Sequence, residues 1–131
     1  MYRIGKKFSF DASHQLFGLP EGHQCGRLHG HTYTVEVTFV GEELTGEGWI
    51  FDFGALKSFG EWLKATFDHR HLNDVAGLSQ PTSENLAKFI YDHFADEAGL
   101  DMLPVFGDVY IEKVRVSETP STFAEFFPSD L

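Results

Sequence analysis

The chain has 131 residues, 42% of them apolar, which is enough for one compact domain with its own hydrophobic core. We therefore expect a single domain that spans residues 1–131. Lys and Arg total 10 against 20 Asp and Glu, so the net charge is −10 and the protein's field would repel a nucleic-acid backbone. This excludes nucleic acid as an expected partner, whereas a small anionic substrate would need a local group of cations.

The cysteine count and the hydropathy pattern indicate where the protein works. Cys25 is the only cysteine, so no internal disulfide can form, and the N-terminal MYRIGKKFSF lacks the apolar stretch of a signal peptide. No run approaches the ~20 apolar residues that cross a bilayer. We therefore expect a soluble cytoplasmic protein. Fourteen Phe is a high count for this length and is consistent with an oligomer that buries some of them between subunits.

Two strands are predicted in the first forty residues. Apolar and polar side chains alternate from 3 to 14, and alternate more strictly from 29 to 39. The first strand ends in His14, and the second begins with His29-Gly30-His31. The Gly-rich acidic stretch at 41–50 interrupts any period and is predicted to be a loop.

Two helices are predicted next. Asp52 can cap the first, which should end near Phe67, and its apolar residues recur at helical spacing: Leu56, Phe59, Leu63 and Phe67. After a loop at 72–80, Pro81 and Thr82 mark the start of the second helix. Its apolar stripe is Leu86, Phe89, Ile90 and Phe94, and Gly99 and Pro104 break the chain beyond it.

The remaining residues are typical of strands. The segment 105–116 is rich in β-branched and aromatic residues, and after the turn at Thr119-Pro120-Ser121 the run TFAEFF (122–127) predicts one more strand. The order is ββααββ. It favours an α+β fold in which an antiparallel four-stranded sheet carries both helices on one face.

A histidine pattern on the second strand predicts a metal site. Residues i and i+2 of a strand point to the same side, so His29 and His31 present two imidazoles together. His14, at the end of the neighbouring strand, can complete a three-histidine set, which suits Zn²⁺ and leaves one coordination position open. The alternatives are ordinary surface histidines, or a structural site in which Cys25 is a fourth ligand.

Four further residues are candidates for chemistry. Cys25 lies in the polar run HQCGRLHGH, where a thiol beside a metal and Arg27 could act as a base or nucleophile. Asp68 and His69 follow the first helix, and a carboxylate that orients a histidine can relay protons. Glu118, at the end of the third strand, could accept paired N–H donors from a heterocycle. The alternative for Cys25 is a small buried apolar side chain, and the alternative for Asp68, His69 and Glu118 is an ordinary surface residue.

Six blocks in order resemble the 6-pyruvoyl-tetrahydropterin synthase superfamily, and most of all its bacterial 6-carboxy-5,6,7,8-tetrahydropterin synthases of queuosine biosynthesis. They are FSFDASH (8–14), CGRLHGHTY (25–33), GWIFDFGALK (48–57), DHRHLND (68–74), PTSEN (81–85) and VRVSETP (114–120). The three residues between Cys25 and His29 match the carboxy synthases, whereas the animal-type enzymes usually have a longer gap. The ending after Glu118 departs from the usual bacterial pattern.

The resemblance implies a tunnelling fold (T-fold) that assembles as a homohexamer with sites between subunits. It implies that His14, His29 and His31 bind zinc, that Cys25 accepts protons, that Asp68 and His69 form the relay, and that Glu118 anchors the pterin ring. The implied reaction converts 7,8-dihydroneopterin triphosphate to 6-carboxy-5,6,7,8-tetrahydropterin, acetaldehyde and triphosphate.

The triphosphate of that substrate requires compensating positive charge. We expect Arg3, Lys6, Lys7 or Arg27, from one subunit or from different subunits, to provide some of it, and only Arg27 lies inside one of the six blocks. Two alternatives to the reaction stay open: a 6-pyruvoyl-tetrahydropterin synthase, and a metal-binding module without turnover.

Overall fold

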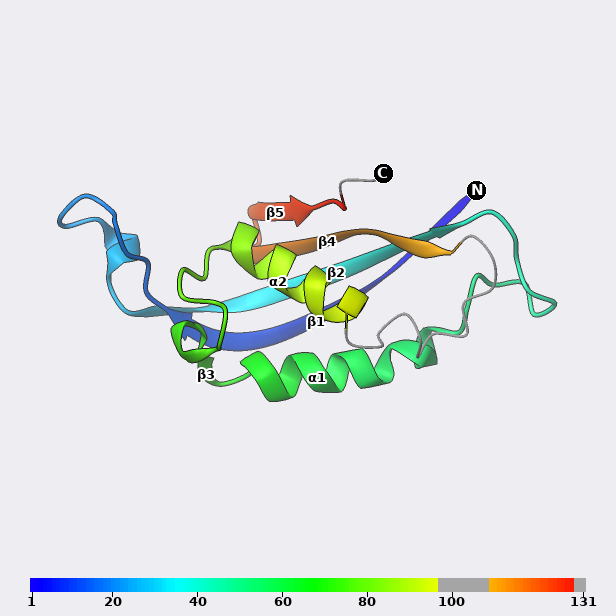
Figure 1. The fold of residues 1–131 in the computed structure, drawn as a ribbon, viewed down its shortest axis with the longest axis horizontal. Coiled ribbons are helices and arrows are strands. Elements are labelled where there is room, and N and C mark those ends of the chain that lie inside the picture. Colours follow the sequence, from blue (N-terminus) through cyan, green and yellow to red (C-terminus); the bar gives the residue numbers. More distant parts are fainter. Residues whose placement is uncertain (97–108, 129–131) are drawn as a thin grey trace.

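The computed structural model describes residues 1–96 and 109–128, and its elements are labelled in Figure 1. The strands are β1 (Tyr2–His14), β2 (His29–Gly41), β3 (Arg70–His71), β4 (Tyr110–Thr119) and β5 (Thr122–Phe126). The α-helices are α1 (Lys57–Phe67) and α2 (Ser83–Asp96). Short 3₁₀ turns are η1 (Gln24–Gly26), η2 (Phe53–Leu56) and η3 (Leu72–Asp74).

The strands form one sheet in the order β3-β1-β2-β4-β5. The pairs β1–β2, β2–β4 and β4–β5 are antiparallel, as predicted. The predicted sheet of four antiparallel strands is wrong in one respect, because β3 is a fifth strand and pairs parallel with β1 through Ala12 opposite Arg70 and Ser13 opposite His71. A strand of two residues is too short to leave a periodic signal in the sequence.

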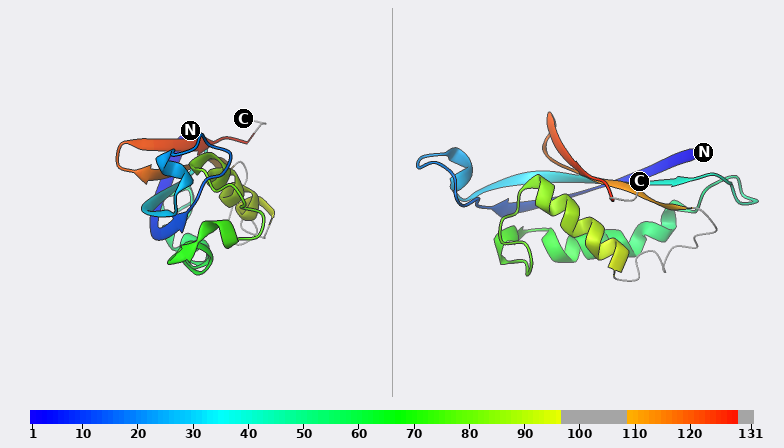
Figure 2. Two further views of the ribbon diagram at one scale, coloured as in Figure 1. Left: turned by 90° about the vertical axis from the view of Figure 1, so that its left-hand side faces the viewer. Right: turned by 45° about the horizontal axis from the view of Figure 1, so that its top comes forward.

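Both helices lie on the same side of the sheet, as Figure 2 shows. The side chain of Asp52 caps η2 rather than α1, since its Oδ1 accepts a hydrogen bond from the Gly54 N–H at 2.9 Å. The helix α1 therefore begins at Lys57 and ends at Phe67, where the sequence predicted its end. The Thr82 hydroxyl accepts the N–H of Asn85 at 3.1 Å at the start of α2.

The hydrophobic core fills the space between the sheet and the helices. In β1 the even-numbered residues from Phe8 onward are buried or half-buried and the odd-numbered ones lie on the other face, as the alternation predicted. The 0% exposed residues of β2, the helices and β4 include Val35, Val37, Phe39, Phe67, Leu86, Ile90 and Val114. Within the described residues, neither helix is long and apolar enough to cross a membrane. The predicted breaks at Gly99 and Pro104 and the first residues of the predicted strand 105–116 lie outside the described residues.

The face of the sheet away from the helices carries charges of alternating sign. In the strand register, Lys7 lies opposite Glu36, Glu36 opposite Arg115, and Arg115 opposite Glu125. The sign of the charge thus changes at each step from β1 to β5. Opposite charges on neighbouring strands favour this pairing register, by a modest amount for exposed groups.

Candidate metal centre and substrate pockets

Three imidazoles meet where β1 ends and β2 begins. His14 is the last residue of β1 and lies opposite His29, the first residue of β2, and His31 is two residues further along the same strand. One ring nitrogen from each lies within 4.8 Å of those from the other two. The Nε2 atoms of His14 and His29 are 2.9 Å apart. The structure thus brings together the three histidines that the sequence singled out.

The opposite ring nitrogens orient two of these imidazoles. Nδ1 of His14 lies 2.7 Å from the carbonyl oxygen of Pro81, and Nδ1 of His29 lies 2.7 Å from that of Arg27. A carbonyl oxygen can only accept, so each Nδ1 carries the proton and each Nε2 presents a lone pair. Two lone pairs that face each other at 2.9 Å repel unless a cation lies between them.

The donor set fits a metal ion. Nε2 of His31 is buried and has no hydrogen-bond partner in the described part of the chain. Tetrahedral zinc with Zn–N bonds of about 2.0–2.1 Å holds its nitrogen ligands roughly 3.3 Å apart. The Nε2 atoms of His14 and His29, 2.9 Å apart, are near that spacing, and the nitrogen of His31 lies within 4.8 Å of both. Three imidazoles from two paired strands therefore form a ligand set that would leave one tetrahedral position for another group.

Burial keeps two of these histidines in the form that binds metals. Burial lowers the pKa of His14, against the opposing effect of its hydrogen bond to the Pro81 carbonyl. Burial also lowers the pKa of His31, against the opposing charge of Glu118. A neutral imidazole is the state that coordinates a metal, so both residues are ready to bind one without first losing a proton.

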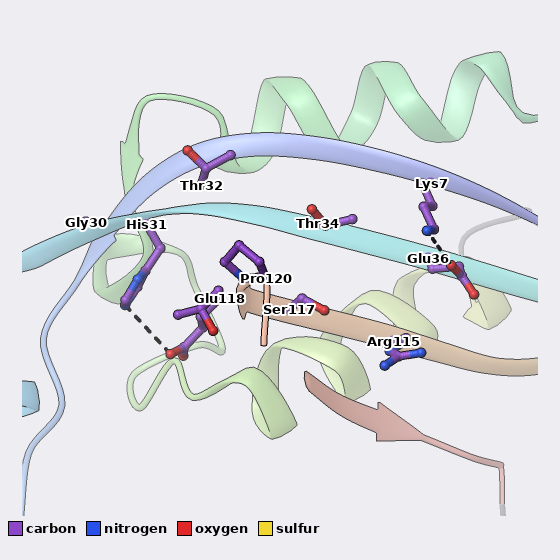
Figure 3. Close-up of a pocket in the computed structure, with 11 residues that line it drawn as sticks. Lys7, Gly30, His31, Thr32, Thr34, Glu36, Arg115, Ser117, Glu118 and Pro120 are labelled. Carbon is purple, nitrogen blue, oxygen red and sulfur yellow. Dashed lines mark ion pairs between the residues drawn. The ribbon is translucent and has the colours of Figure 1, made fainter. Parts of the chain in front are cut away.

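Glu118 lies at the mouth of a pocket beside this cluster. Its Oε2 is 3.7 Å from Nε2 of His31, and Figure 3 shows the two side chains pointing toward one another. The pocket has a volume of about 680 Å³, and Lys7, Thr34 and Arg115 line it with them. Gly30 also lines it, and its lack of a side chain leaves His31 accessible from this face.

Tyr33 is a buried polar residue next to the cluster that the sequence pattern did not mark as functional. Its ring centre lies 5.6 Å from that of His31 and 6.0 Å from that of His14. Its side chain is 0% exposed, and its hydroxyl has no hydrogen-bond partner among the described residues. Burial raises the pKa of this phenol, so the hydroxyl stays protonated. Tyr33 shares the parity of His29 and His31, which is the signal that could have marked it.

Cys25 lies in the turn η1 and is half-buried. Its N–H donates to Nδ1 of His23 at 3.1 Å, and its carbonyl oxygen accepts the N–H of Leu16 at 3.1 Å. Within the described residues, ligand atoms cluster in two groups, the three histidines and a second group of Asp11, Asp68 and His69, and the Cys25 sulfur is in neither. The geometry therefore does not support Cys25 as a fourth structural ligand.

Asp68 and His69 form a separate pair at the end of α1. Nδ1 of His69 lies 3.0 Å from Oδ2 of Asp68, and Oδ1 of Asp68 accepts the N–H of Asp11 at 3.0 Å. The Asp11 and His69 hydrogen bonds lower the pKa of Asp68, which keeps it ionised. His69 has a φ of 57°, a left-handed conformation that costs a residue with a Cβ free energy and is common at functional sites. It shares a second pocket, of about 560 Å³, with His31.

The predicted cations lie in different surroundings. Arg3 forms two hydrogen bonds of 2.7 Å with the Glu112 carboxylate. Lys7 lines the first pocket and faces Glu36 at 3.7 Å. Lys6 lies over the Phe8 ring, and Arg27 is exposed in the loop after η1 and lines neither pocket that contains His31. The structure thus does not bring the predicted cations together.

Two side-chain amides fasten the loop that carries Cys25, and the sequence did not predict them. Asn73 accepts the N–H of Gln15 at 2.9 Å and donates to the Gln15 carbonyl oxygen at 2.7 Å. Gln80 likewise accepts the N–H of Phe17 at 3.0 Å and donates to the Phe17 carbonyl oxygen at 2.9 Å. Each amide acts as a strand partner for one residue beyond the end of β1. We call Asn73 and Gln80 the amide clamp.

A mixed sheet with two helices on one face and a histidine cluster at its end defines the T-fold class. The chain belongs to the 6-pyruvoyl tetrahydropterin synthase family, whose model matches residues 3–129. A Caenorhabditis elegans structure titled 6-pyruvoyl tetrahydropterin synthase superposes with a TM-score of 0.78 and 25% identity, over 98% of this chain and 96% of that one.

Two relatives are similar over nearly the whole chain. A Synechocystis protein named 6-carboxy-5,6,7,8-tetrahydropterin synthase is 39% identical over 97% of this chain and 94% of its own length. A Bacillus subtilis protein of the same name is 35% identical over 97% of this chain and 86% of its own length. The family that the six sequence blocks indicated is confirmed.

Proposed function

We propose that this chain is a zinc-dependent 6-carboxy-5,6,7,8-tetrahydropterin synthase. It converts 7,8-dihydroneopterin triphosphate and water to 6-carboxy-5,6,7,8-tetrahydropterin, acetaldehyde and triphosphate. The observation that carries the proposal is the convergence of ring nitrogens of His14, His29 and His31 beside a pocket that Glu118 lines. The names of the relatives at 35% and 39% identity support the choice of product.

The chain's own residues have separate tasks in this proposal. His14, His29 and His31 would hold the zinc ion, which would supply a Lewis acid for the oxygens of the substrate side chain. Glu118 accepts paired N–H bonds from the pterin ring and so fixes its orientation. Cys25 removes and returns protons on the side chain, and His69 relays them while Asp68 holds the orientation of its ring. The site would be completed between subunits of a homohexamer.

Incubation of the zinc-loaded protein with 7,8-dihydroneopterin triphosphate tests the proposal. We expect acetaldehyde and 6-carboxy-tetrahydropterin, identified by mass spectrometry. A 6-pyruvoyl product without acetaldehyde would instead favour the alternative activity, which the C. elegans structure's title supports. No turnover of any pterin would leave a metal-binding module.

The role of Cys25 has its own test. We expect Cys25→Ala to abolish turnover while the zinc content stays unchanged, because the sulfur lies outside the histidine cluster. Loss of zinc from this variant would contradict a catalytic thiol. We also propose that the product enters queuosine biosynthesis in the cytoplasm, and neighbouring queuosine genes would support that assignment.

A further inference from the structure

The cations of the chain divide into two groups by their partners, and all of them lie within the described residues. Arg3, Lys7, Lys88 and Lys113 each form an ion pair with a carboxylate. Within the part of the chain that the structure describes, no such pair is formed by Lys6, Arg27, Lys57, Lys64, Arg70 and Arg115. A guanidinium without a carboxylate partner keeps its full charge for a ligand.

Arg70 and Arg115 are the unpaired cations that line a pocket together with His31. The guanidinium carbon of Arg115 lies 3.5 Å from the centre of the Phe123 ring, and Arg115 lies between Glu36 and Glu125 in the strand register. Glu36 and Glu125 are themselves paired with Lys7 and Lys113, so Arg115 is one charge in a row of alternating signs rather than an isolated cation. Arg70 is exposed and has no such neighbour on either side in the register, since β3 is an edge strand.

The pocket around Arg70 offers further groups that can bind phosphate oxygens. It holds about 560 Å³ and reaches from His69 to His31 past Gly30, which has no side chain to obstruct it. Ser13 and His71 line it and are hydrogen-bonded to each other at 2.9 Å. Two carboxylates lie at this pocket: Asp11 lines it and accepts a hydrogen bond from the Thr32 hydroxyl, and Asp68 lies within 4.8 Å of Asp11 and His69. Asp68 is engaged with the Asp11 N–H and the His69 ring, which leaves Arg70 as the cation of the described lining without a carboxylate partner.

We propose that Arg70 binds the triphosphate of the substrate, in the pocket that Arg70 shares with His31. The assignment rests on the proposed function for the identity of the ligand. The paired N–H donors of a guanidinium match the geometry of phosphate oxygens. The parallel pairing of β3 with β1 fixes the position of Arg70 relative to His14, two residues beyond its register partner Ala12. Arg70 was not among the four cations that the sequence suggested.

Binding of inorganic triphosphate to the metal-loaded full-length protein tests this role, by calorimetry after removal of unbound metal. We expect Arg70→Gln to weaken binding roughly 10-fold or more, because a charge-assisted hydrogen bond is lost. Arg70→Lys should recover part of the affinity, since it keeps the charge but not the paired donors. Lys57→Gln removes one positive charge from the exposed start of α1, outside both pockets, and should leave the affinity unchanged.

Substrate kinetics provide a second readout. Arg70→Gln should raise the KM for dihydroneopterin triphosphate much more than it lowers kcat, and should leave the affinity for dihydroneopterin, which has no phosphate, unchanged. Equal triphosphate affinities of wild type and Arg70→Gln would overturn the assignment, as would a loss confined to Arg115→Gln. If Arg70→Gln weakens triphosphate binding but dihydroneopterin never binds, the Arg70 site stands and the pterin function fails.

Discussion

The side-chain amide of Asn73 and the backbone of Gln15 form two hydrogen bonds in opposite directions, of 2.9 and 2.7 Å. The same amide also donates to the Ser79 carbonyl oxygen at 3.3 Å. Gln15 in turn donates through its side chain to the carbonyl oxygen of Gly26, the residue after Cys25, at 2.9 Å. Asn73 thus links η3 to the turn that carries the thiol, although Asn73 lies 48 positions after Cys25 in the sequence.

We expect Asn73→Asp to lower the free energy of unfolding by about 1–3 kcal/mol. The variant loses the donor and places a carboxylate beside the carbonyl oxygens of Gln15 and Ser79. Urea unfolding measures the change. Asp74→Asn is the matched control, since Asp74 is exposed. Faster proteolysis within residues 15–28 should accompany the loss, and an unchanged cleavage rate would show that the amide clamp does not fasten this loop.

Removal of the metal should destabilise the protein. A ligand that binds the folded state alone stabilises it by about 4 kcal/mol at a concentration 1,000 times its Kd. We expect a chelator to lower the Tm, and zinc to restore it. His31→Ala should lose the metal and no longer respond to the chelator. His93→Ala alters a ring stacked on Trp62, away from the cluster, and should keep its metal. Full metal content in His31→Ala would contradict the assigned ligand set.

Tyr33→Phe should leave the free energy of unfolding unchanged or raise it by up to about 1 kcal/mol. The variant removes a buried hydroxyl that has no partner in the described residues, while the ring keeps its packing. Thermal unfolding of the metal-loaded protein measures this change in the free energy of unfolding. Tyr110→Phe, at a 39% exposed position, controls for the loss of a hydroxyl as such. A loss of more than about 1 kcal/mol in Tyr33→Phe would reveal a bound water or ligand at this hydroxyl.

The Arg3–Glu112 pair should make part of the stability depend on pH. The hydrogen bonds from Arg3 lower the pKa of Glu112, so the folded state holds this proton less firmly than the unfolded state, whose Glu pKa is about 4.3. The stability that the Arg3–Glu112 pair contributes is therefore fully present above the Glu pKa of the unfolded state. It is lost as the pH falls through the lower Glu112 pKa of the folded state. We expect the stability difference between wild type and Glu112→Gln to shrink between pH 5 and the acid limit of folding, as followed by urea unfolding.

A double-mutant cycle identifies the cause of this pH dependence. In an Arg3→Gln background, Glu112→Gln should have a much smaller pH-dependent effect, because the partner that lowers the pKa is absent. High salt should reduce the effect of the pair in the wild type, since the Arg3 side chain is 63% exposed. The same pH profile with and without Arg3 would assign the shift to another group.

The periodic parts of the fold could be predicted from the sequence, and the aperiodic parts could not. The alternation in β1 and β2 gave both strands and their buried faces, and the spacing of Phe59, Leu63 and Phe67 gave the end of α1. The two-residue strand β3 and the turn η2 have no period to detect. They depend on contacts between residues far apart in the chain, such as the Ala12–Arg70 pair.

The same division holds for the site. The i, i+2 rule on one strand brings His29 and His31 together, and a neighbouring strand end supplies His14, so simple geometry was enough. To predict which cations bind the substrate, one must know which of them already form ion pairs with carboxylates. The sequence does not show that Arg3 forms an ion pair with Glu112. The two residues come together only because β1 and β4 both pair with β2. Arg70 was not among the predicted cations, because its exposure and its place in a pocket with His31 are visible only in three dimensions.

One row of alternating charges across the sheet ends in opposite signs on β1 and β5. The row that begins with Lys7 on β1 ends with Glu125 on β5, so one lateral boundary of the sheet is cationic in this row and the other anionic. Two copies that met through like boundaries would bring equal charges opposite each other, which is unfavourable. Copies that met through unlike boundaries would continue the alternation. Such contacts are heterologous, and successive heterologous contacts close into a ring rather than a two-fold dimer when the rotation allows it.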